Sequence, residues 1–428
     1  MPVVPFPPLR TSMAATLLGM ALVPAHAQPD PVRVPAPTFV DRAANTIVQP
    51  GDSSGMNAWH AQLDRLFFHG EGQVNVVHIG GSHIQADMWS NHVRHRLQHT
   101  APGVRAARGF IFPFSLARTN NPYWYLPEAT GTWTAVRNVT RADTSILGLA
   151  GISVTSRDTL SELRVSFRGE VYAGYTFQQV RVLHSVDSSF AVEAWDPDTT
   201  VRISADFDPD EGLTTFRYDR HMDTLRLRFR RTDSTQTHIT LHGIVLDTDD
   251  PGFVYHAIGV NGASTRSYLR CQLFTAHLAQ LRPDLVVFSI GVNDAHDADF
   301  SKAVFKRNYA ALIDRVRQAA PDAAILLTTN TDSYHRRRVV NRNGAAVRAA
   351  MLELGRERGV AVWDLYTVMG GPGSIAQWEK AGLAKKDRIH FNRAGYTLLA
   401  DLQTAALMEA YGAHLKHGTG PRHAGGEP

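Results

Sequence analysis

Short apolar runs alternate with longer amphipathic segments in two parts of the chain. In the first part, the apolar run Val74–Ile79 is closed by Gly80 and Gly81 and precedes a helical pattern over Ala86–Leu97. Beyond residue 250 the alternation returns, with apolar runs at Phe253–Ile258, Leu285–Ile290, Ala324–Leu327 and Val360–Trp363 and helical patterns over Tyr268–Leu281, Ala303–Ala319, Asn341–Arg358 and Ala394–Ala410. Strands that alternate with helices predict a three-layer α/β domain, in which helices cover both faces of a parallel sheet.

The stretch from residue 123 to residue 250 has a different pattern. Apolar and polar side chains alternate with a period of two in Leu163–Phe167 and Leu225–Phe229. Asp-Pro-Asp turn signals recur at residues 196–198 and 208–210. Many short alternating strands joined by such turns are typical of an antiparallel β-sandwich. The sequence therefore predicts an antiparallel β-sandwich inserted into the α/β domain.

The N-terminal region has the layout of a secretory signal peptide. Arg10 precedes an apolar run from Met13 to Val23, and small residues follow at Ala25 and Ala27. We expect an exported protein of the periplasm or cell envelope, without stable membrane insertion after cleavage, because no other apolar run is long enough to span a bilayer. The predicted organisation is a signal peptide at 1–27, a Pro-rich linker at 28–57, the first part of the α/β domain at 58–122, the β insertion at 123–250, the second part at 251–412 and a flexible tail at 413–428.

The composition narrows the possible classes of protein. The 428 residues are 43% hydrophobic and 20% charged, which excludes wholesale disorder. The formal net charge is only +4 and the arginines are scattered, so we expect no nucleic-acid partner. Cys271 is the single cysteine, which excludes an intrachain disulfide framework and a Cys-rich zinc site. We expect neither a metal nor an organic cofactor.

Four segments at the ends of predicted strands carry candidate chemistry, and the first contains Ser82. Open parallel sheets place ligands at the carboxyl ends of their strands. Ser82 follows a buried strand and a Gly-Gly turn and opens a helix. Its hydroxyl would be exposed at the sheet edge, and its N–H would lie at the helix start, where negative charge is favoured. Alternatively, Ser82 is an ordinary helix N-cap.

The second and third segments supply candidate hydrogen-bond donors. Gly262 lies in the Gly-Val-Asn-Gly-Ala turn after the Phe253–Ile258 strand and would let a backbone N–H approach a substrate oxygen. Asn293 follows the next strand in Ser-Ile-Gly-Val-Asn-Asp, where its side-chain amide could donate to an oxyanion. The alternatives are a simple glycine turn and an Asx-turn involving Asn293 or Asp294.

The fourth segment holds Asp387 and His390, just before the C-terminal helix. A carboxylate three residues from a histidine can hold one ring nitrogen while the other faces a nucleophile, as in the base half of a serine triad. The alternative is an incidental surface pair, since the chain has 20 His.

Together, the order Gly-Gly-Ser-His, Gly-x-x-Gly, Gly-Val-Asn-Asp and Asp-x-x-His resembles the SGNH/GDSL hydrolase superfamily. The resemblance covers residues 70–125 and 252–412 and implies an SGNH-hydrolase-like sheet. It implies that Ser82 is the nucleophile, His390 the base and Asp387 the residue that orients it. It further implies an oxyanion hole formed by the Ser82 N–H, Gly262 and Asn293.

A narrower resemblance concerns bacterial peptidoglycan O-acetylesterases. It rests on the Gly-Ser-His-x-Gln-Ala-Asp run at 81–87, the stretch Arg118–Pro122, the junction Tyr255–Gly262 and the β insertion. This resemblance implies removal of O-acetyl groups from a polysaccharide, with peptidoglycan favoured, through an acetyl-serine intermediate. One departure is Gly81, where the superfamily usually has Asp, and we expect it to alter the support of the turn.

The sequence is also compatible with other functions and substrates. The same residues would serve a polysaccharide O-acetyltransferase, in which a sugar hydroxyl replaces water, or a glycan-binding protein without catalysis. The acetylated polymer could also be an exopolysaccharide or xylan. Tyr123, Trp124, Tyr125 and Trp133 at the start of the insertion form either a sugar-stacking platform or part of the core.

Overall fold

The computed structural model describes residues 34–50, 54–140, 145–169, 175–186, 189–235 and 237–417. The predicted signal peptide lies outside the described residues, and so do residues 418–428 of the predicted tail. Within the described part of the chain, no helix has the length and apolar character needed to cross a membrane.

The predicted parallel sheet is confirmed. The sheet has six strands in the order β1-β19-β16-β15-β2-β14. All neighbours run parallel except β1, which pairs antiparallel with β19. The strand bounds are β1 Ile47–Val48, β2 Gln73–Gly80, β14 Gly252–Gly259, β15 Leu285–Ser289, β16 Ala324–Thr328 and β19 Ala361–Trp363.

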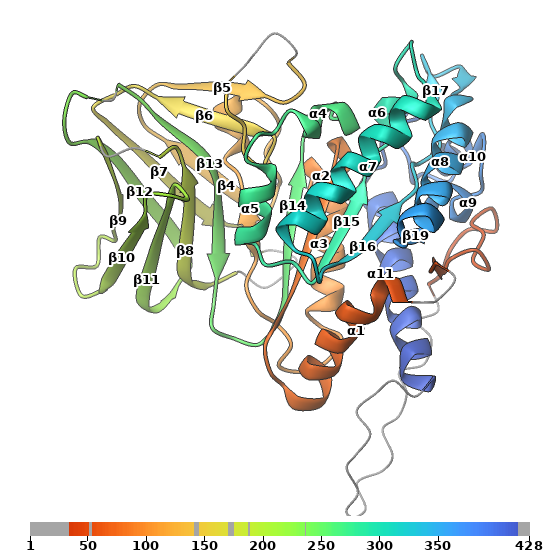
Figure 1. Ribbon diagram of the computed structural model, residues 1–428, viewed down its shortest axis with the longest axis horizontal. Coiled ribbons are helices and arrows are strands. Elements are labelled where there is room, and N and C mark those ends of the chain that lie inside the picture. Colours follow the sequence, from red (N-terminus) through yellow and green to blue (C-terminus); the bar gives the residue numbers. More distant parts are fainter. Residues whose placement is uncertain are drawn as a thin grey trace, which may run out of the picture. The chain divides into compact units, whose positions relative to one another are not determined.

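Successive side chains of a strand point to opposite faces of the sheet, so the apolar core consists of two clusters, one on each face. In β2, Val74 and Val76 belong to one hydrophobic cluster, whereas Val77 and Ile79 belong to the other. Helices cover both faces, which gives the three layers seen in Figure 1. The cluster with Val74 and Val76 includes side chains of α1 Asn57–Asp64, α3 Met88–Leu97, α9 Leu365–Val368, α10 Ser374–Lys380 and α11 Arg393–Lys416. The cluster with Val77 and Ile79 includes side chains of α4 Thr265–Leu269, α5 Phe274–Gln280, α6 Val292–Ala295, α7 Lys302–Ala319 and α8 Asn343–Arg358.

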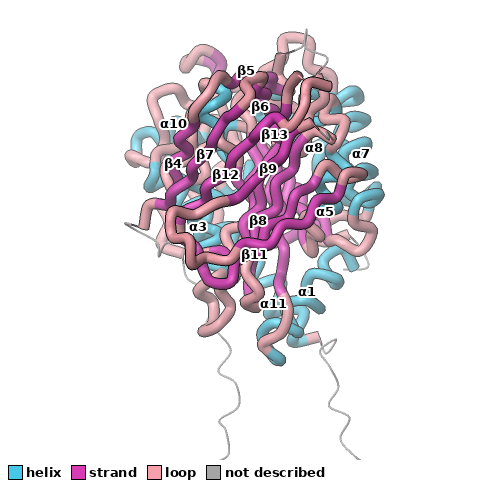
Figure 2. The backbone as a smooth tube through the Cα atoms, turned by 90° about the vertical axis from the view of Figure 1, so that its left-hand side faces the viewer, coloured by secondary structure: helices cyan, strands magenta, loops and turns pink. Residues whose placement is uncertain are grey.

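Two antiparallel sheets are built mainly from the predicted insertion. One has the order β10-β11-β8-β13-β6-β5, with β3 also paired to β13, and the other has the order β4-β7-β12-β9. Figure 2 shows the strands of the second sheet side by side in that order. The bounds are β3 Gly109–Ile111, β4 Tyr125–Ala129, β5 Trp133–Arg137, β6 Ile152–Ser156, β7 Leu160–Phe167, β8 Phe177–His184, β9 Phe190–Ala194, β10 Ile203–Asp208, β11 Leu213–Met222, β12 Thr224–Arg231 and β13 Ile239–Asp247.

The antiparallel sheets and the α/β layers share one apolar core. Leu163 and Leu227 from one antiparallel sheet and Val182 from the other lie in the same hydrophobic cluster. Phe274 and Leu278 of α5 belong to it as well. The insertion is therefore packed continuously against the α/β part, and the boundaries of a separate β domain stay a prediction.

The prediction of a loose linker is wrong for residues 34–48. Val34 and Val40 are buried, and β1 extends the parallel sheet at its β19 edge. The Asn45 side chain donates to the Leu402 carbonyl over 3.0 Å and accepts from the Trp363 indole over 2.9 Å. The prolines of this segment disfavour a helix, but an extended chain that contains proline can still lie along the edge of a sheet.

The predicted helix over Ala86–Leu97 corresponds to α3, Met88–Leu97, and a separate short helix, α2 Ser82–Gln85, precedes it. Asp87, with a left-handed φ of 50°, lies between the two helices. The expected helix over Tyr268–Leu281 is divided into α4 and α5. Apolar spacing continues across this break, so the pattern alone does not reveal it.

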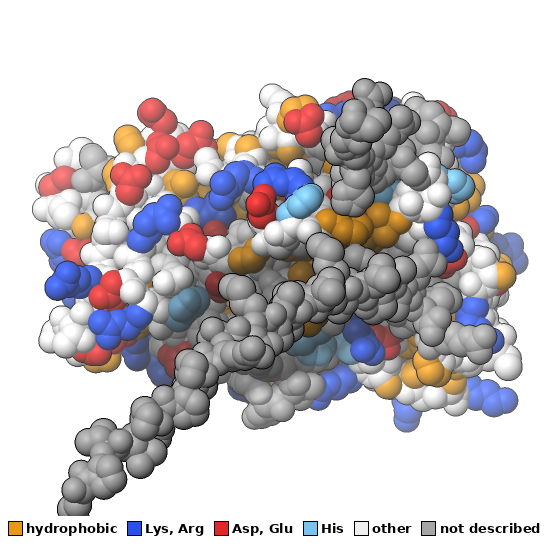
Figure 3. All heavy atoms as spheres, turned by 90° about the horizontal axis from the view of Figure 1, so that it is seen from below, with side chains coloured by type: hydrophobic (Ala, Val, Ile, Leu, Met, Phe, Trp, Pro, Cys, Tyr) orange, Lys and Arg blue, Asp and Glu red, His pale blue; other side chains and the backbone are white. Residues whose placement is uncertain are grey.

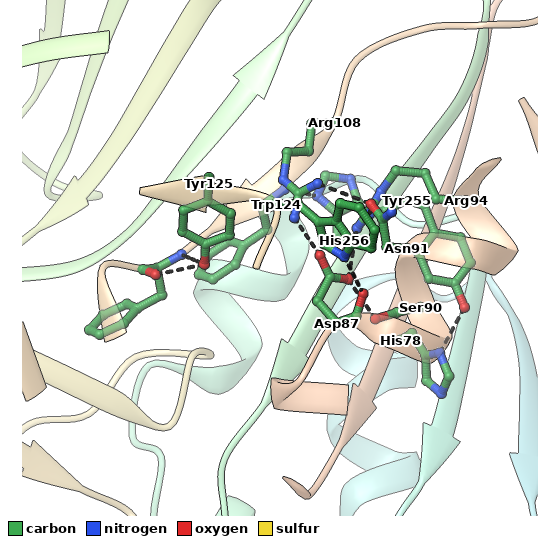
Figure 4. A network of polar contacts seen from close by, with 12 residues as sticks. His78, Asp87, Ser90, Asn91, Arg94, Arg108, Trp124, Tyr125, Tyr255 and His256 are labelled. Atoms are coloured by element: carbon green, nitrogen blue, oxygen red, sulfur yellow. Dashed lines mark hydrogen bonds and ion pairs between the residues drawn. The ribbon is translucent and has the colours of Figure 1, made fainter. Parts of the chain in front are cut away.

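Asp87 is the centre of a buried polar network (Figure 4). Its carboxylate accepts from the Ser90 hydroxyl over 2.6 Å and pairs with Arg94 and Arg108. Its carbonyl accepts from the Trp124 indole over 2.9 Å. Burial by itself would raise the pKa of the Asp87 carboxyl, but the two guanidinium groups outweigh it and lower that pKa. The network ties α3 to the start of the antiparallel sheets.

We expect Asp87→Ala to lower the free energy of unfolding by about 3–5 kcal/mol, because it leaves two buried guanidinium groups without their carboxylate. Denaturant unfolding of the purified protein measures the change. Asp322→Ala, at an exposed carboxylate, is the matched control and should change stability by less than about 0.5 kcal/mol. Equal stability of the two variants would contradict the expectation.

Candidate active site

Ser82 lies at the carboxyl end of β2, where the strand turns into α2. Gly81 occupies the N-cap position and Ser82 is the first residue of the helix. The Ser82 hydroxyl therefore does not cap the helix, and the N-cap alternative is wrong. Its Oγ lies 2.8 Å from Nε2 of His390, 308 positions away in the sequence. The Ser82 N–H is at the helix start, where N–H groups have no acceptor within the helix.

His390 and Asp387 lie in the loop between α10 and α11. Nδ1 of His390 is 2.9 Å from Oδ2 of Asp387. The other carboxylate oxygen accepts the backbone N–H groups of Ile389 and His390, each over 3.0 Å. Burial would raise the pKa of the Asp387 carboxyl, but the His390 N–H and ring outweigh it and lower that pKa.

This arrangement determines which ring nitrogen can accept a proton. An ionised carboxylate only accepts hydrogen bonds, so Asp387 favours the tautomer of His390 with hydrogen on Nδ1. Nε2 then presents its lone pair to the Ser82 hydroxyl. The geometry is that of a nucleophile, a base and an orienting carboxylate in one chain of hydrogen bonds.

Gly262 and Asn293 lie beside Ser82. Both line the same cleft as Ser82 and His390. Gly262 has a φ of +82°, a conformation that suits glycine, and only Val139 approaches the position of a Cβ there, at 3.8 Å. The Asn293 amide donates to the Ala263 carbonyl over 2.9 Å. Because an amide NH₂ has two hydrogens, this bond leaves one for a ligand in the cleft.

Gly81, the residue before Ser82, is closely surrounded. A Cβ placed on Gly81 would lie 3.1 Å from Nδ2 of Asn293 and 3.6 Å from the Ala263 carbonyl. Glycine therefore lets the Asn293 amide approach the turn that holds Ser82. The expected effect of the Gly81 departure, a changed support of the turn, stays a prediction.

Asp294, next to Asn293, holds two loops together. Its carboxylate accepts from the Thr265 hydroxyl over 2.6 Å and from the Thr265 N–H over 3.2 Å. Burial raises the pKa of this carboxyl to about 6. The contact joins the start of α4, just after the Gly262 turn, to the Asn293 segment.

Gln85 is a site residue that the sequence-based assignment of roles missed. Its side-chain oxygen accepts from the Asn261 N–H over 2.6 Å, and its amide donates to Thr119 over 3.0 Å and to the Asn120 carbonyl over 2.9 Å. The Asn261 side chain also donates to Asn120. Gln85 is on the same helix as Ser82, so it fixes the Gly262 turn relative to Ser82. The sequence signal that could have pointed to Gln85 is its position in the Gly-Ser-His-x-Gln-Ala-Asp run at 81–87.

His83 is a second residue without an assigned role in the sequence analysis. It is buried, its Nδ1 lies 2.8 Å from the Tyr396 hydroxyl, and its ring centroid is 5.3 Å from that of His390. Burial and, to a lesser extent, the electrostatic interaction with the His390 imidazole lower the pKa of His83 to about 3. A neutral ring therefore packs behind His390.

Ser82, Gly262, Asn293 and His390 line a cleft of about 1080 Å³. The loop at Asn120 and the antiparallel sheets contribute to its lining through Tyr123, Leu126 and Arg168. Trp124 and Tyr125, two of the four aromatic candidates for sugar stacking, are buried in the core. Tyr125 also lines the cleft. Trp133 does not line the cleft; it packs on Phe229 with ring centroids 5.6 Å apart. Among the described residues, no group of three or more His, Cys, Asp or Glu is placed to hold a metal.

Comparisons with known proteins bear on the fold and the family. Residues 244–398 match the model of the GDSL-like Lipase/Acylhydrolase family, a region that contains Gly262, Asn293, Asp387 and His390. A solved structure of a peptidoglycan O-acetylesterase has a similar fold, with 18% identity, a TM-score of 0.68 and coverage of 86% of this chain and 99% of that chain. A lipase/acylhydrolase from Enterococcus faecalis is 23% identical over 37% of this chain and 77% of its own, with a TM-score of 0.30. No match was found among curated proteins.

Proposed function

We propose that this chain, which carries a GDSL-like lipase/acylhydrolase domain on an SGNH hydrolase fold, is a serine esterase that removes O-acetyl groups from a cell-wall polysaccharide. The observation that carries the proposal is the chain of hydrogen bonds from Ser82 through His390 to Asp387 at the cleft. A hydroxyl alone is a weak nucleophile, and a base within hydrogen-bond reach is what activates it.

In the first half of the reaction, Ser82 Oγ attacks the carbonyl carbon of the acetyl ester while Nε2 of His390 takes the hydroxyl proton. The carbonyl oxygen becomes an oxyanion, which the Ser82 and Gly262 N–H groups and the Asn293 amide stabilise. The bond between the carbonyl carbon and the sugar oxygen then breaks. His390 gives its proton to that sugar oxygen, so the products are a free sugar hydroxyl and acetyl-Ser82.

In the second half, water attacks the acetyl carbon of acetyl-Ser82 while His390 takes a proton from it. The same donors stabilise the second oxyanion. The bond from carbon to Ser82 Oγ breaks, and His390 returns the proton to Oγ, which releases acetate. Asp387 keeps its negative charge throughout and stabilises the imidazolium that forms in each half.

Peptidoglycan is the substrate that we propose. The fold likeness to a peptidoglycan O-acetylesterase extends over 86% of this chain and 99% of that chain. The cleft is also far larger than one acetyl group requires, as a polymer substrate needs. Together with the predicted signal peptide, this supports action in the periplasm or cell envelope.

Acetate release from O-acetylated peptidoglycan, measured beside release from acetylated xylan, tests this function. We expect the wild-type protein to release acetate faster from peptidoglycan, and Ser82→Ala to define the background on both polymers. Release from peptidoglycan at the level of Ser82→Ala would contradict the proposal. Faster release from xylan would contradict the choice of polymer.

A further inference from the structure

A short hairpin with a basic tip lies between β16 and α8. Its strands, β17 Tyr334–His335 and β18 Val339–Val340, pair antiparallel, and the arginines 336–338 join them. These three arginines are the longest run of consecutive Lys or Arg residues in the chain, and Arg342 follows shortly after β18. All four side chains are exposed. Figure 1 shows β17 at the upper end of the α/β part, above α8, so this basic hairpin, residues 334–342, presents its charges at one end of the molecule.

No carboxylate balances the charge of the basic hairpin. The sequence has no Asp or Glu between Asp332, which is buried, and Glu353. Among the described residues, none of the four arginines is in an ion pair, whereas the nearby Arg388 is paired with Glu379 over 2.7 Å. The face shown in Figure 3, by contrast, has acidic and basic side chains interspersed. The basic hairpin therefore carries an unbalanced positive charge, which attracts an anionic partner.

The backbone of the tip has a conformation that arginine seldom adopts. The Arg338 N–H donates to the His335 carbonyl over 3.0 Å, which closes a four-residue turn. The central residues of this turn, Arg336 and Arg337, have left-handed φ values of 48° and 64°. Asn and Gly tolerate this conformation best, and Asn-Gly is the usual pair in such a turn. Local conformation therefore does not account for the two arginines, whereas a ligand for their charge does.

Contacts with the neighbouring loop hold the tip in place. The Tyr334 N–H donates to the Arg388 carbonyl over 3.1 Å, and the Arg388 guanidinium donates to the Arg337 carbonyl over 3.1 Å. The same guanidinium lies over the Tyr334 ring, 5.0 Å from its centroid. Val339, which follows the arginine run, is 59% exposed. The tip is therefore a fixed surface that combines guanidinium groups with an exposed apolar side chain.

We propose that the basic hairpin docks on an anionic phospholipid surface, with its four arginines on lipid phosphates and Val339 in the headgroup region. A guanidinium binds phosphate through paired hydrogen bonds, and each basic side chain close to an anionic leaflet adds to the attraction. The exposed valine favours lipid over a purely polar polyanion, because it can leave water among the headgroups. Such docking is peripheral and needs no membrane-spanning helix. It goes beyond the proposed esterase activity and does not depend on it.

Sedimentation of the purified protein with lipid vesicles tests the proposal. We expect binding to vesicles of phosphatidylglycerol and phosphatidylcholine, and none to vesicles of phosphatidylcholine alone. Added salt should weaken the binding, because it screens exposed charges. The double variant Arg336→Asn, Arg337→Gly should bind about tenfold to thirtyfold more weakly, since it lacks two of the four charges. Val339→Ser should weaken binding by a smaller factor, about threefold to tenfold, since one apolar side chain is lost.

The double variant separates the loss of charge from a loss of folding. Asn-Gly suits the left-handed turn, so its thermal midpoint should not fall below that of the wild type. The matched control is the double variant Arg217→Gln, Arg307→Gln, at exposed arginines of β11 and α7. It removes the same charge from other surfaces and should bind vesicles like the wild type.

Three results would overturn the proposal. The first is a wild-type protein that binds both kinds of vesicle equally or neither of them. The second is a folded Arg336→Asn, Arg337→Gly variant that binds phosphatidylglycerol vesicles as tightly as the wild type. The third is hairpin-dependent binding to isolated peptidoglycan without binding to vesicles, which would assign the charge to a polymer. None of these results bears on acetate release, which tests the esterase separately.

Discussion

Ser82→Ala is expected to lower kcat for acetate release by about 10⁵- to 10⁶-fold, as loss of the nucleophile does in serine hydrolases. The variant keeps the donors of Gly262 and Asn293, but it has no oxygen that can form the acetyl intermediate. His390→Ala should cost a similar factor, because the Ser82 hydroxyl then has no base at 2.8 Å. The double variant should be no slower than either single one, since the two groups act in the same step.

Single-turnover acetate release and labelling by a serine-reactive phosphonate measure these losses. Ser115→Ala is the matched control, because Ser115 is exposed and does not line the cleft, and it should keep wild-type activity. Ser82→Ala should also keep the wild-type thermal midpoint. A folded Ser82→Ala variant with more than about 1% of wild-type kcat is incompatible with the assignment of the nucleophile.

Asp387→Asn is expected to lower kcat by about 10⁴-fold. Two backbone N–H groups, of Ile389 and His390, donate to Oδ1 of Asp387, so an amide at this position keeps its oxygen there. Its NH₂ group then faces Nδ1 of His390 and donates to it. The imidazole is driven to carry its proton on Nε2, which can no longer accept the proton of Ser82.

Comparison with Asp387→Ala tests this explanation. If the carboxylate acts through the tautomer and charge of His390, the isosteric Asn variant should be no more active than Ala. KM should change little in both, because Asp387 does not line the cleft. Activity of Asp387→Asn within about tenfold of the wild type would show that the carboxylate does not orient the base.

The strands and the candidate site residues could be read from local patterns. Apolar runs such as Leu285–Ile290 correspond closely to buried strands, because a strand covered on both faces is apolar at nearly every position. Ser82, Asn293 and His390 each follow a strand or precede a helix, where a parallel sheet exposes side chains to ligands. The structure brings these residues together, and their catalytic roles stay predictions.

Other features depend on contacts that no local pattern records. Asp87 has a left-handed conformation between α2 and α3, and its carboxylate is paired with the buried Arg94 and Arg108. Gln85 looks like a polar helix residue, yet it is buried against Asn261. The segment at Val40 reads as a linker, yet it packs on the sheet.

The sequence by itself determined the order of strands and helices and the chemical groups at their ends, since periodicity and turn residues act over a few positions. Only the tertiary structure decided which groups meet, because 308 positions separate Ser82 from its partner imidazole and only the packed sheet brings them within 2.8 Å. It also decided that Arg168, which follows strand β7 of the insertion, lines the cleft beside Ser82, since that depends on how the antiparallel sheets pack against the α/β core.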